Sequence, residues 1–455
     1  MLMRIRSVLP LLMSLGLLLM LAANGSARDL RTGTPSREGL SPERLQRITA
    51  HMNRAVADGI MVGGLGMIVR NGKIVYRQTY GLSDREAGTA MLDDSIFRIY
   101  SMSKPITAVA LMMLYEEGRF FLNDPVAKYL PELADLELAV STADSASGIV
   151  SDGATTRGNG ARDERRLGQT RKPKRQPTIR DLLRHTAGFS YGIFGDTEVD
   201  RLYRDAGLLE QKTIADFVVE LGNIPLQYEP GSKWHYSVSV DVQGRLVEVL
   251  SGMRFGEFLE QRLFRPLDMK DTGFVVPADK RKRLAKLYSP EGTKMSLNSV
   301  WQRSESTRLL PAEPGISRGY EEGSTFESGG GGLVSTAEDY MRFCLMMLNG
   351  GELDGVRFLS PRTVTLMTRN HLGDIPMGWG RTGVGFGLGF AVALDPGQIG
   401  ELGSTGEYSW GGAAGTRFWI DPQEQLIGLF MVQSIPHQTR LAGEFKVLTY
   451  QAMVD

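Results

Sequence analysis

The chain has 455 residues, which is enough for one large domain or two smaller ones. Its 52 basic and 52 acidic residues cancel to a formal net charge of zero, which argues against nucleic acid or an acidic membrane surface as a partner. Cys344 is the single cysteine, so an intrachain disulfide is excluded, and the five histidines lack the spacing of a metal-binding motif.

The first 27 residues have the pattern of an export signal. Arg4 and Arg6 precede a leucine-rich core over residues 8–23, and small residues lead up to Ala27. We therefore expect a signal peptide over residues 1–27, cleaved after Ala27, and a secreted or periplasmic protein with no stable membrane insertion afterwards. The alternative is an uncleaved N-terminal anchor, although the apolar core is short for a membrane span.

The next part of the chain predicts a helix and then a pair of strands. Residues 28–40 are polar, and we expect a flexible segment there. Ser41 followed by Pro42 predicts the start of a helix that runs to about residue 57. Two stretches of alternating apolar residues then flank Asn71-Gly72, a dipeptide typical of a β-hairpin.

An apolar run follows Ser101. Residues 107–117 form a strongly apolar run, carried by residues 108–114, that closes on Gly118 and predicts a buried helix with Pro105 in its first turn. Ser101 would lie at the helix N-terminus, and Lys104 would return to the same face. A serine becomes a nucleophile when a base takes its proton, and a lysine can serve if burial lowers its pKa. Ser-x-x-Lys alone is a weak pattern, because a capping serine beside a solvated lysine also produces it.

The middle of the chain predicts helices interrupted by one polar insertion. Residues 141–176 are rich in Ser, Gly, Thr, Asp and Arg, with almost no large apolar residues, so we predict a disordered insertion there. Including this insertion, we expect a mainly helical subdomain over about residues 105–325. Tyr236 stands between a Pro-Gly turn and a predicted helix. A phenol near an ammonium can relay a proton, so Tyr236 is a candidate general acid or base beside Lys104.

The last part of the chain returns to strand patterns. Residues 409–420 and 425–433 predict a hairpin, and residues 441–454 predict a terminal helix. Small residues over 410–415 would let a backbone approach a ligand and donate N–H groups to an oxyanion. With strands at both ends, we predict an α+β fold in which terminal helices flank an antiparallel sheet. Ser101 would lie at the cleft between this sheet and the helical subdomain.

Three motifs in this order resemble those of the serine beta-lactamase and penicillin-binding-protein superfamily. Within it, they are most similar to those of class C beta-lactamase-like carboxylesterases (esterase family VIII). The motifs are Ser101-Met102-Ser103-Lys104, Tyr236-Ser237-Val238 and Trp410-Gly411-Gly412. The resemblance covers about residues 41–450 and implies a single catalytic domain over residues 41–455 with a beta-lactamase/transpeptidase-like fold.

The resemblance also implies a role for each motif. Ser101 would form an acyl-enzyme, with Lys104 and Tyr236 sharing the proton transfers as general base and acid. The backbone N–H groups of Ser101 and Ala413 would form the oxyanion hole. The resemblance implies no metal and no organic cofactor, and its partner would be a small-molecule ester or amide. It leaves the oligomeric state open.

Two departures from the resemblance concern the substrate. Class C beta-lactamases carry asparagine where this chain has Val238, and lysine where it has Trp410. The loss of both weakens recognition of an anionic beta-lactam or peptidoglycan stem, because each missing partner of a buried polar group costs about 1–3 kcal/mol. We expect Val238, Trp410, Gly411 and Gly412 to bind the substrate, and Trp410 suits an apolar or neutral acyl ester.

The sequence therefore predicts an exported serine hydrolase that cleaves carboxylic esters or transfers their acyl groups to an alcohol. One alternative is a class C-like beta-lactamase, D-aminopeptidase or DD-peptidase acting on beta-lactam or peptidoglycan-derived amides. Another is an inactive relative that binds cell-wall fragments. The presence of Ser101, Lys104 and Tyr236 together argues against the inactive relative.

Overall fold

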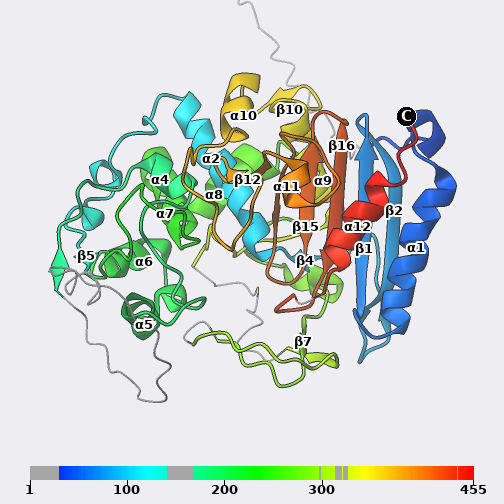
Figure 1. Cartoon of the computed structure of the whole chain (residues 1–455), viewed down its shortest axis with the longest axis horizontal. Coiled ribbons are helices and arrows are strands. Elements are labelled where there is room, and N and C mark those ends of the chain that lie inside the picture. Colours follow the sequence, from blue (N-terminus) through cyan, green and yellow to red (C-terminus); the bar gives the residue numbers. More distant parts are fainter. Residues whose placement is uncertain (1–29, 141–168, 297–298, 313–319, 321–325, 438) are drawn as a thin grey trace, which may run out of the picture.

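A large antiparallel sheet forms the centre of the molecule. The computed structural model describes residues 30–140, 169–296, 299–312, 320, 326–437 and 439–455. The sheet has eight strands in the order β12 (Val384–Phe386), β13 (Ala391–Ala393), β14 (Tyr408–Gly411), β15 (Arg417–Asp421), β16 (Leu426–Val432), β1 (Gly63–Arg70), β2 (Lys73–Asp84) and β3 (Thr89–Ala90). Helices lie on both of its faces and in a cluster beside it (Figure 1). The predicted α+β fold with an antiparallel sheet is confirmed.

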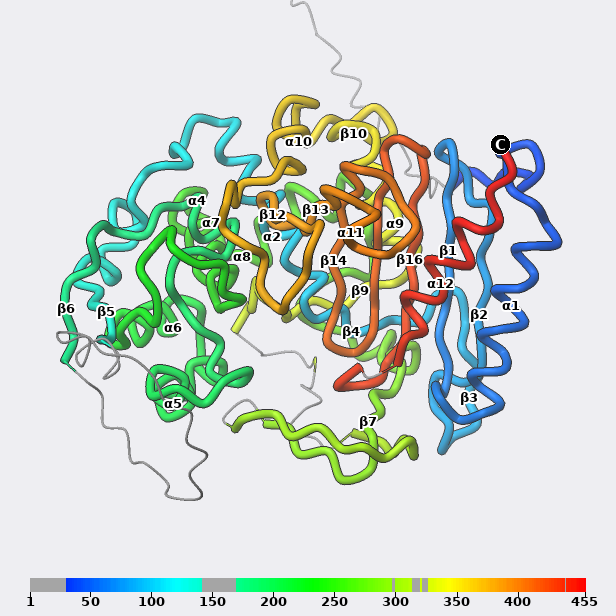
Figure 2. Tube along the Cα trace, viewed as in Figure 1, coloured from blue at the N-terminus to red at the C-terminus, as the bar shows by residue number. Residues whose placement is uncertain are grey.

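The first and last strands of the chain meet inside the sheet. β1 pairs antiparallel with β16, with Gly64 opposite Val432. Figure 2 shows the two strands side by side, blue and red, although they come from opposite ends of the chain. The predicted hairpin joins β1 to β2 at Asn71-Gly72, and both turn residues have positive φ, 52° and 72°.

The predicted strand over residues 409–420 is in fact two strands. β14 ends at Gly411 and β15 begins at Arg417, and a tight turn lies between them. Gly415 has a φ of 91° in this turn, and its N–H donates to Gly412 O at 3.0 Å. A run of small residues without large side chains to pack therefore forms a turn rather than the middle of a strand.

The terminal helices α1 (Pro42–Ala57) and α12 (Leu441–Tyr450) cover one face of the sheet. The Ser41 hydroxyl accepts a hydrogen bond from Arg44 N at 3.3 Å and caps α1 as predicted. The apolar side of α1 packs on the same core cluster as Phe445 of α12 and Trp419 of the sheet. The expectation that terminal helices flank the sheet is confirmed.

The opposite face carries α9 (Ala337–Leu348), which packs on β15 and β16, and α2 (Ser103–Glu116) lies in the same apolar core. Every residue of α2 from Ser103 to Leu114 is buried, as its apolar sequence predicted. α2 also packs on α7 (Ser239–Ser251), so it joins the sheet to the helical cluster. That cluster further contains α4 (Ile179–Leu183), α5 (Glu198–Asp205), α6 (Ile214–Leu221) and α8 (Phe255–Leu259).

Short elements complete the described chain. The paired strands are β4 (Phe97–Arg98) with β9 (Val334–Ser335), β5 (Leu138–Ala139) with β6 (Thr170–Arg171), β7 (Tyr288–Pro290) with β8 (Leu309–Pro311), and β10 (Glu352–Leu353) with β11 (Val356–Arg357). The short α-helices are α10 (Pro361–Met367) and α11 (Pro396–Ile399). The short 3-10 segments are η1 (Pro35–Glu38), η2 (Tyr100–Met102), η3 (Val126–Lys128), η4 (Pro131–Leu133), η5 (Leu208–Glu210) and η7 (Ala278–Arg283), and η6 (Glu260–Phe264) is a π-helical turn.

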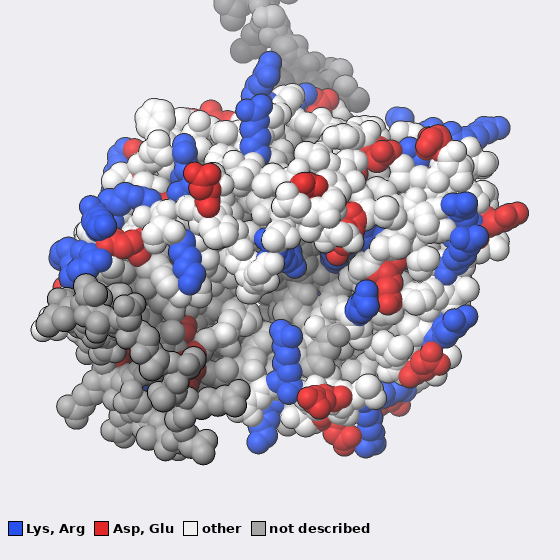
Figure 3. Space-filling view, viewed as in Figure 1, with Lys and Arg blue, Asp and Glu red and all other residues white. Residues whose placement is uncertain are grey.

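Charges of both signs are mixed on the face of the molecule shown in Figure 3. On the face shown in Figure 3, lysine and arginine side chains are interspersed with aspartate and glutamate, without an extended patch of one sign. This pattern agrees with the zero net charge. Within the part of the chain that the structure describes, no helix combines the length and apolar character needed to cross a membrane. The predicted signal peptide, residues 1–27, lies outside the described residues.

The prediction of a flexible segment does not hold over residues 30–40. Leu40 is fully buried and pairs in a β-bridge with Met453. Lys73 Nζ donates to Glu38 Oε1 at 2.5 Å, and Arg70 Nη1 donates to Gly39 O at 3.2 Å. The end of the segment is therefore held against the sheet by Leu40 and by the Glu38 carboxylate.

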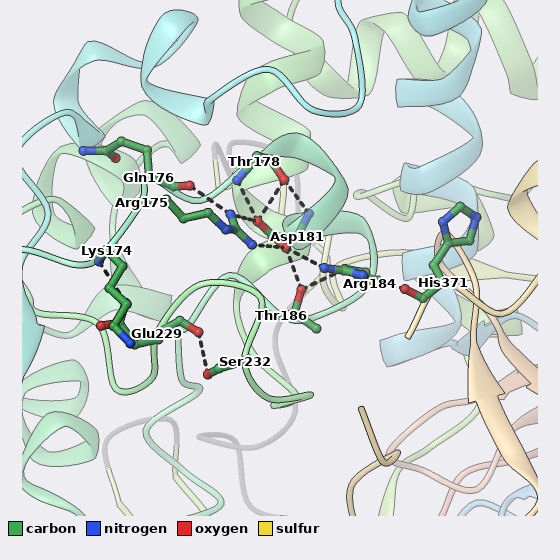
Figure 4. Close-up of polar contacts among 10 residues, drawn as sticks. All are labelled: Lys174, Arg175, Gln176, Thr178, Asp181, Arg184, Thr186, Glu229, Ser232 and His371. Carbon is green, nitrogen blue, oxygen red and sulfur yellow. Dashed lines mark hydrogen bonds and ion pairs between the residues drawn. The ribbon is translucent and has the colours of Figure 1, made fainter. Parts of the chain in front are cut away.

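The predicted insertion, residues 141–176, is ordered at its end. Residues 141–168 lie outside the described residues, but β6 pairs with β5 directly after them. Arg175 donates to Asp181 Oδ2 at 2.6 Å, and Arg184 donates to Asp181 Oδ1 at 3.0 Å (Figure 4). Asp181 is fully buried in α4. The basic end of the insertion is thus held by a buried carboxylate, which composition alone does not reveal.

Candidate active site

A cleft opens at Ser101, where η2 meets the helical cluster. Its volume is about 780 Å³, counting space open to solvent. Ser101, Tyr236 and Ala413 line it together with apolar side chains, including those of Phe194 and Trp301. None of the described residues that line it is a lysine, arginine, aspartate or glutamate. Among the described residues, the lining of the cleft is therefore uncharged, and hydroxyl groups of serines and tyrosines stand among its apolar side chains.

Ser101 lies in the single turn η2, two residues before α2 begins. The preceding residue, Tyr100, has a φ of 43°, in the left-handed region that non-glycine residues rarely adopt. Such strained backbone is stored where the surrounding structure fixes a functional geometry. The predicted buried helix is confirmed, and Ser101 lies just before its N-terminus.

Lys104 is almost completely buried, with 1% of its surface exposed. Its Nζ lies 3.2 Å from Ser101 Oγ, 2.9 Å from Tyr191 Oη and 2.5 Å from Gly330 O. Burial lowers the pKa of Lys104 to about 7, and the charge of Asp241 opposes this decrease. A large part of Lys104 is consequently a neutral amine at neutral pH.

Tyr236 contacts both Ser101 and Lys104. Its hydroxyl donates to Ser101 Oγ at 2.7 Å, and its ring centroid lies 4.6 Å from Lys104 Nζ. Burial raises the pKa of Tyr236, and hydrogen bonds with Ser101 and Trp410 offset only part of that increase. The phenol therefore keeps its proton at neutral pH and acts as a hydrogen-bond donor to Ser101.

The third motif lies behind the serine and does not line the cleft, whereas Ala413, the residue that follows it, does. A Cβ atom on Gly412 would lie 2.5 Å from Ile99 O, so a glycine is needed where this turn passes the backbone before Ser101. Trp410 is only 8% exposed, with its ring 5.6 Å from that of Tyr236 and 5.3 Å from that of Phe386. The Trp410 side chain therefore packs against Tyr236 on the side away from the cleft and helps to hold Tyr236 in place.

Val238 lies at the start of α7 and is fully buried. Its N–H donates to Ser190 O at 3.1 Å, and its side chain belongs to the main apolar core. The structure thus brings Ser101, Lys104, Tyr236 and Ala413 together around one cleft. The four residues expected to bind substrate, Val238, Trp410, Gly411 and Gly412, do not line this cleft.

Three residues that contact or face Lys104 were not found from the sequence: Tyr191, Asp241 and Gly330. Tyr191 lies in the loop after α4, and Gly330 lies in the glycine-rich turn before β9. The sequence did contain two signals. Asp241 stands inside a helix with many apolar residues, and Gly330 belongs to a run of four glycines, which indicates that another part of the protein packs closely against this backbone. Neither signal says which distant side chain it meets.

In the described parts of the chain, no three or more His, Cys, Asp or Glu side chains are placed together to hold a metal ion. Cys344 is buried inside α9, and burial raises its pKa well above the ordinary value of a thiol. It is therefore an inert core residue.

Comparison with known proteins identifies relatives along most of the chain. The family profile described as Beta-lactamase matches residues 48–447. An uncharacterised protein of Mycobacterium tuberculosis is 33% identical over 399 residues, covering 84% of this chain and 88% of that protein. Esterase EstB of Burkholderia gladioli is 29% identical over 391 residues, covering 82% of this chain and 86% of the esterase.

A solved structure has the same fold. The structure of EstCE1, titled a hydrolase with promiscuous acyltransferase activity, superposes with a TM-score of 0.68 at 24% identity. The match covers 90% of this chain and 99% of EstCE1. At this identity the likeness concerns the fold alone.

Proposed function

Since this chain belongs to the beta-lactamase family and is a serine hydrolase, we propose that it cleaves uncharged carboxylic esters through an acyl-enzyme on Ser101. The observation that carries the proposal is the triangle of Ser101, Lys104 and Tyr236. Lys104 Nζ and Tyr236 Oη lie 3.2 Å and 2.7 Å from the same Ser101 Oγ. A hydroxyl held between an amine of lowered pKa and a neutral phenol has a base and a proton donor within hydrogen-bond reach.

In the first half of the proposed reaction, Ser101 Oγ attacks the ester carbonyl carbon while its proton passes to the neutral Lys104 amine. The carbonyl oxygen becomes an oxyanion, and the N–H groups of Ser101 and Ala413 would stabilise it, as both residues line the cleft. The C–O bond to the alcohol then breaks. The departing alkoxide takes a proton from Tyr236 or from Lys104, and the acyl group stays on Ser101.

In the second half, a water molecule attacks the acyl-enzyme. Lys104, neutral again, takes a proton of that water, directly or through Tyr236. The tetrahedral intermediate collapses, Ser101 Oγ recovers its proton, and the carboxylic acid leaves. An alcohol in place of the water would give acyl transfer by the same steps.

The preference for an uncharged ester rests on the cleft wall. No charged side chain lines the cleft among the residues described, while Phe194, Trp301 and Ile435 present apolar surface. An anionic substrate would lose its hydration there without gaining a cationic partner. EstB is named an esterase, which supports the same preference. A beta-lactam or peptidoglycan-derived amide is the alternative substrate, to be distinguished by experiment.

The test compares p-nitrophenyl butyrate with a chromogenic cephalosporin as substrates of the purified protein. Ser101→Ala should abolish ester turnover and the trapping of a butyryl group on the protein by mass spectrometry. Ser103→Ala is the matched control, because the Ser103 hydroxyl accepts from Leu333 N at 3.2 Å and belongs to the buried part of α2. Cephalosporin turnover equal to or faster than ester turnover would contradict the proposal, as would ester turnover that survives in Ser101→Ala.

We also propose that residues 1–27 direct export and are removed. Expression of the full chain in a bacterial host, followed by N-terminal sequencing of the periplasmic fraction, should give a protein that begins at Arg28. A protein retained in the membrane with its first residues intact would favour the uncleaved anchor instead.

A further inference from the structure

The hydrogen-bond partners of Lys104 determine where its lone pair points. Gly330 O is a carbonyl and can only accept, so one N–H of Lys104 must point to it, at 2.5 Å. A second N–H points to Tyr191 Oη at 2.9 Å. A neutral amine has two N–H groups and one lone pair, and the remaining direction faces Ser101 Oγ at 3.2 Å. Gly330 and Tyr191 thus aim the basic lone pair at the nucleophile.

The position of the Gly330 peptide is in turn fixed by Asp241. Asp241 Oδ1 accepts from Gly330 N at 3.1 Å and from Ser328 Oγ at 2.6 Å. Asp241 lies on α7 and is fully buried. One carboxylate oxygen therefore holds both ends of the Ser328–Gly330 turn against the helix that packs on α2.

The other oxygen of Asp241 has no such partner. Within the described residues, Asp241 Oδ2 is buried and makes no hydrogen bond. A Cβ atom on Gly330 would lie 2.6 Å from Asp241 Oδ2 and 2.8 Å from Tyr191 Oη, so both atoms border the same small gap beside Lys104. A merely structural anchor for the turn would need only the one accepting oxygen, and an amide would supply that without a buried charge.

We propose that Asp241 is a positioning residue that holds the Ser328–Gly330 turn and, through its charge, sets the protonation state of Lys104. This inference rests on the proposed function, in which Lys104 takes the Ser101 proton. It adds a fourth residue to the triangle, acting through Lys104 rather than on the substrate.

The groups that face Lys104 support this assignment. Tyr191 and Tyr236 are phenols, and the Tyr236 phenol keeps its proton because burial raises its pKa. His185 is neutral, because burial lowers its pKa well below the ordinary value. Asp241 is the carboxylate among these groups, and its charge raises the pKa of Lys104 against the effect of burial. Without Asp241, burial would act unopposed and the amine would lose its proton at a lower pH.

The experiment follows the titration of Lys104 itself. The full chain is labelled with [ε-¹³C]lysine, and Lys104 is assigned by the signal missing in Lys104→Met. The wild-type midpoint should fall near 7. Asp241→Asn keeps an accepting oxygen for Gly330 and Ser328 but removes the charge, and it should lower the midpoint by about one pH unit. The acid limb of kcat/KM for p-nitrophenyl butyrate should move to lower pH by the same amount.

Ser328→Ala is the matched control. It removes the hydrogen bond to Asp241 Oδ1 but keeps the charge, so the Lys104 midpoint should stay at its wild-type value. An Asp241→Asn midpoint equal to that of the wild type would overturn the inference. If the midpoint shifts as expected but no variant turns over any ester, the inference about Asp241 stands and the proposed function fails.

A second measurement serves if Asp241→Asn does not fold. In the wild-type protein labelled with [γ-¹³C]aspartate, the Asp241 signal should show an inflection at the Lys104 midpoint, since the two charges act on each other. The signal is assigned by its displacement in Ser328→Ala. The inflection should vanish in Lys104→Met, and its absence from the wild type would overturn the inference.

Discussion

Lys104 Nζ lies over the ring of Tyr236, 4.6 Å from its centroid, while the hydroxyl of the same tyrosine reaches Ser101 Oγ at 2.7 Å. One side chain thus excludes water from the amine and donates a hydrogen bond to the nucleophile. The ring face attracts an ammonium weakly compared with the water it replaces, so burial still lowers the pKa of Lys104 to about 7.

The pKa of Lys104 predicts the pH dependence of acylation. Lys104 must be neutral to accept the Ser101 proton, so kcat/KM for a neutral ester should rise with pH through about 7 and then level off. Lys104→Arg should lose at least about a hundredfold in kcat/KM, because arginine stays charged across this range. The measurement is kcat/KM for p-nitrophenyl butyrate from pH 5 to 9. A flat profile over this range would show that Lys104 is not the base.

Phe194 predicts the selectivity for the acyl chain. It is 54% exposed, lines the cleft and contacts the ring of Trp301 at 5.4 Å. Phe194→Ala should reduce kcat/KM for p-nitrophenyl octanoate roughly fivefold, about 1 kcal/mol of apolar contact, with little change for the acetate. Phe121→Ala is the control, because Phe121 is 71% exposed but does not line the cleft. Equal effects of the two substitutions on octanoate would contradict this role.

Trp410 predicts the outcome of restoring the lysine found in class C beta-lactamases. Trp410 is 8% exposed and packs on Tyr236 and Phe386, so Trp410→Lys removes aromatic packing and places an ammonium among aromatic rings. The loss should be about 3–5 kcal/mol of unfolding free energy, without a gain in cephalosporin turnover. Trp410→Phe, which keeps a ring, should cost clearly less. Urea unfolding followed by circular dichroism tests both, and a stable Trp410→Lys enzyme with new cephalosporin turnover would refute the expectation.

Asp181 predicts a pH-dependent part of the stability. Burial alone would raise the pKa of Asp181, but hydrogen bonds from Arg175 and Thr178 outweigh it and lower the pKa to about 2. Because the folded pKa lies below the unfolded value, the ionised carboxylate stabilises the fold above about pH 4 and loses this effect as pH falls towards 2. Asp181→Asn should therefore cost about 3–5 kcal/mol at pH 7, and the difference from wild type should shrink in acid.

Asp216 provides the control for Asp181. Both aspartates cap a helix with a threonine three residues earlier, but Asp216 lies in an exposed capping box on α6. Asp216→Asn should cost about 1 kcal/mol or less at pH 7. Urea unfolding of both variants and the wild type at pH 7, pH 4 and about pH 3 is the measurement, because the effect of Asp181 declines between its unfolded pKa of about 4 and its folded pKa of about 2. Equal losses at pH 7 would mean that the paired arginines contribute nothing to Asp181.

The sequence was sufficient to predict elements whose signals are local. The Asn71-Gly72 hairpin, the Ser41 cap of α1 and the apolar run of α2 all lie where the pattern placed them. Its residue type made Tyr236 a candidate beside Lys104, but only the resemblance placed it with Ser101, which is 135 residues away. No periodicity connects two such positions.

The features that could not be predicted depend on contacts between residues far apart in the sequence. Asp241 and Gly330 are 89 residues apart, and nothing in either neighbourhood indicates the other. The burial of Trp410 follows from strands and loops that assemble around it, so a position expected to touch substrate belongs to the core instead. Likewise, the sequence around Arg175 indicates a solvated side chain, and only the structure shows its contact with Asp181.

The pairing of β1 with β16 has a consequence for synthesis on the ribosome. When the β1–β2 hairpin leaves the ribosome, the edge of β1 that pairs with β16 is still unpaired. Leu65 pairs with Met431, so the partner residues are synthesised more than 350 positions later. The sheet behind α2 is therefore incomplete until nearly the whole chain has been made, and such long-range pairing folds slowly. A chain that stops short of β16 has no finished sheet against which to hold its serine, so premature termination should yield no partially active hydrolase.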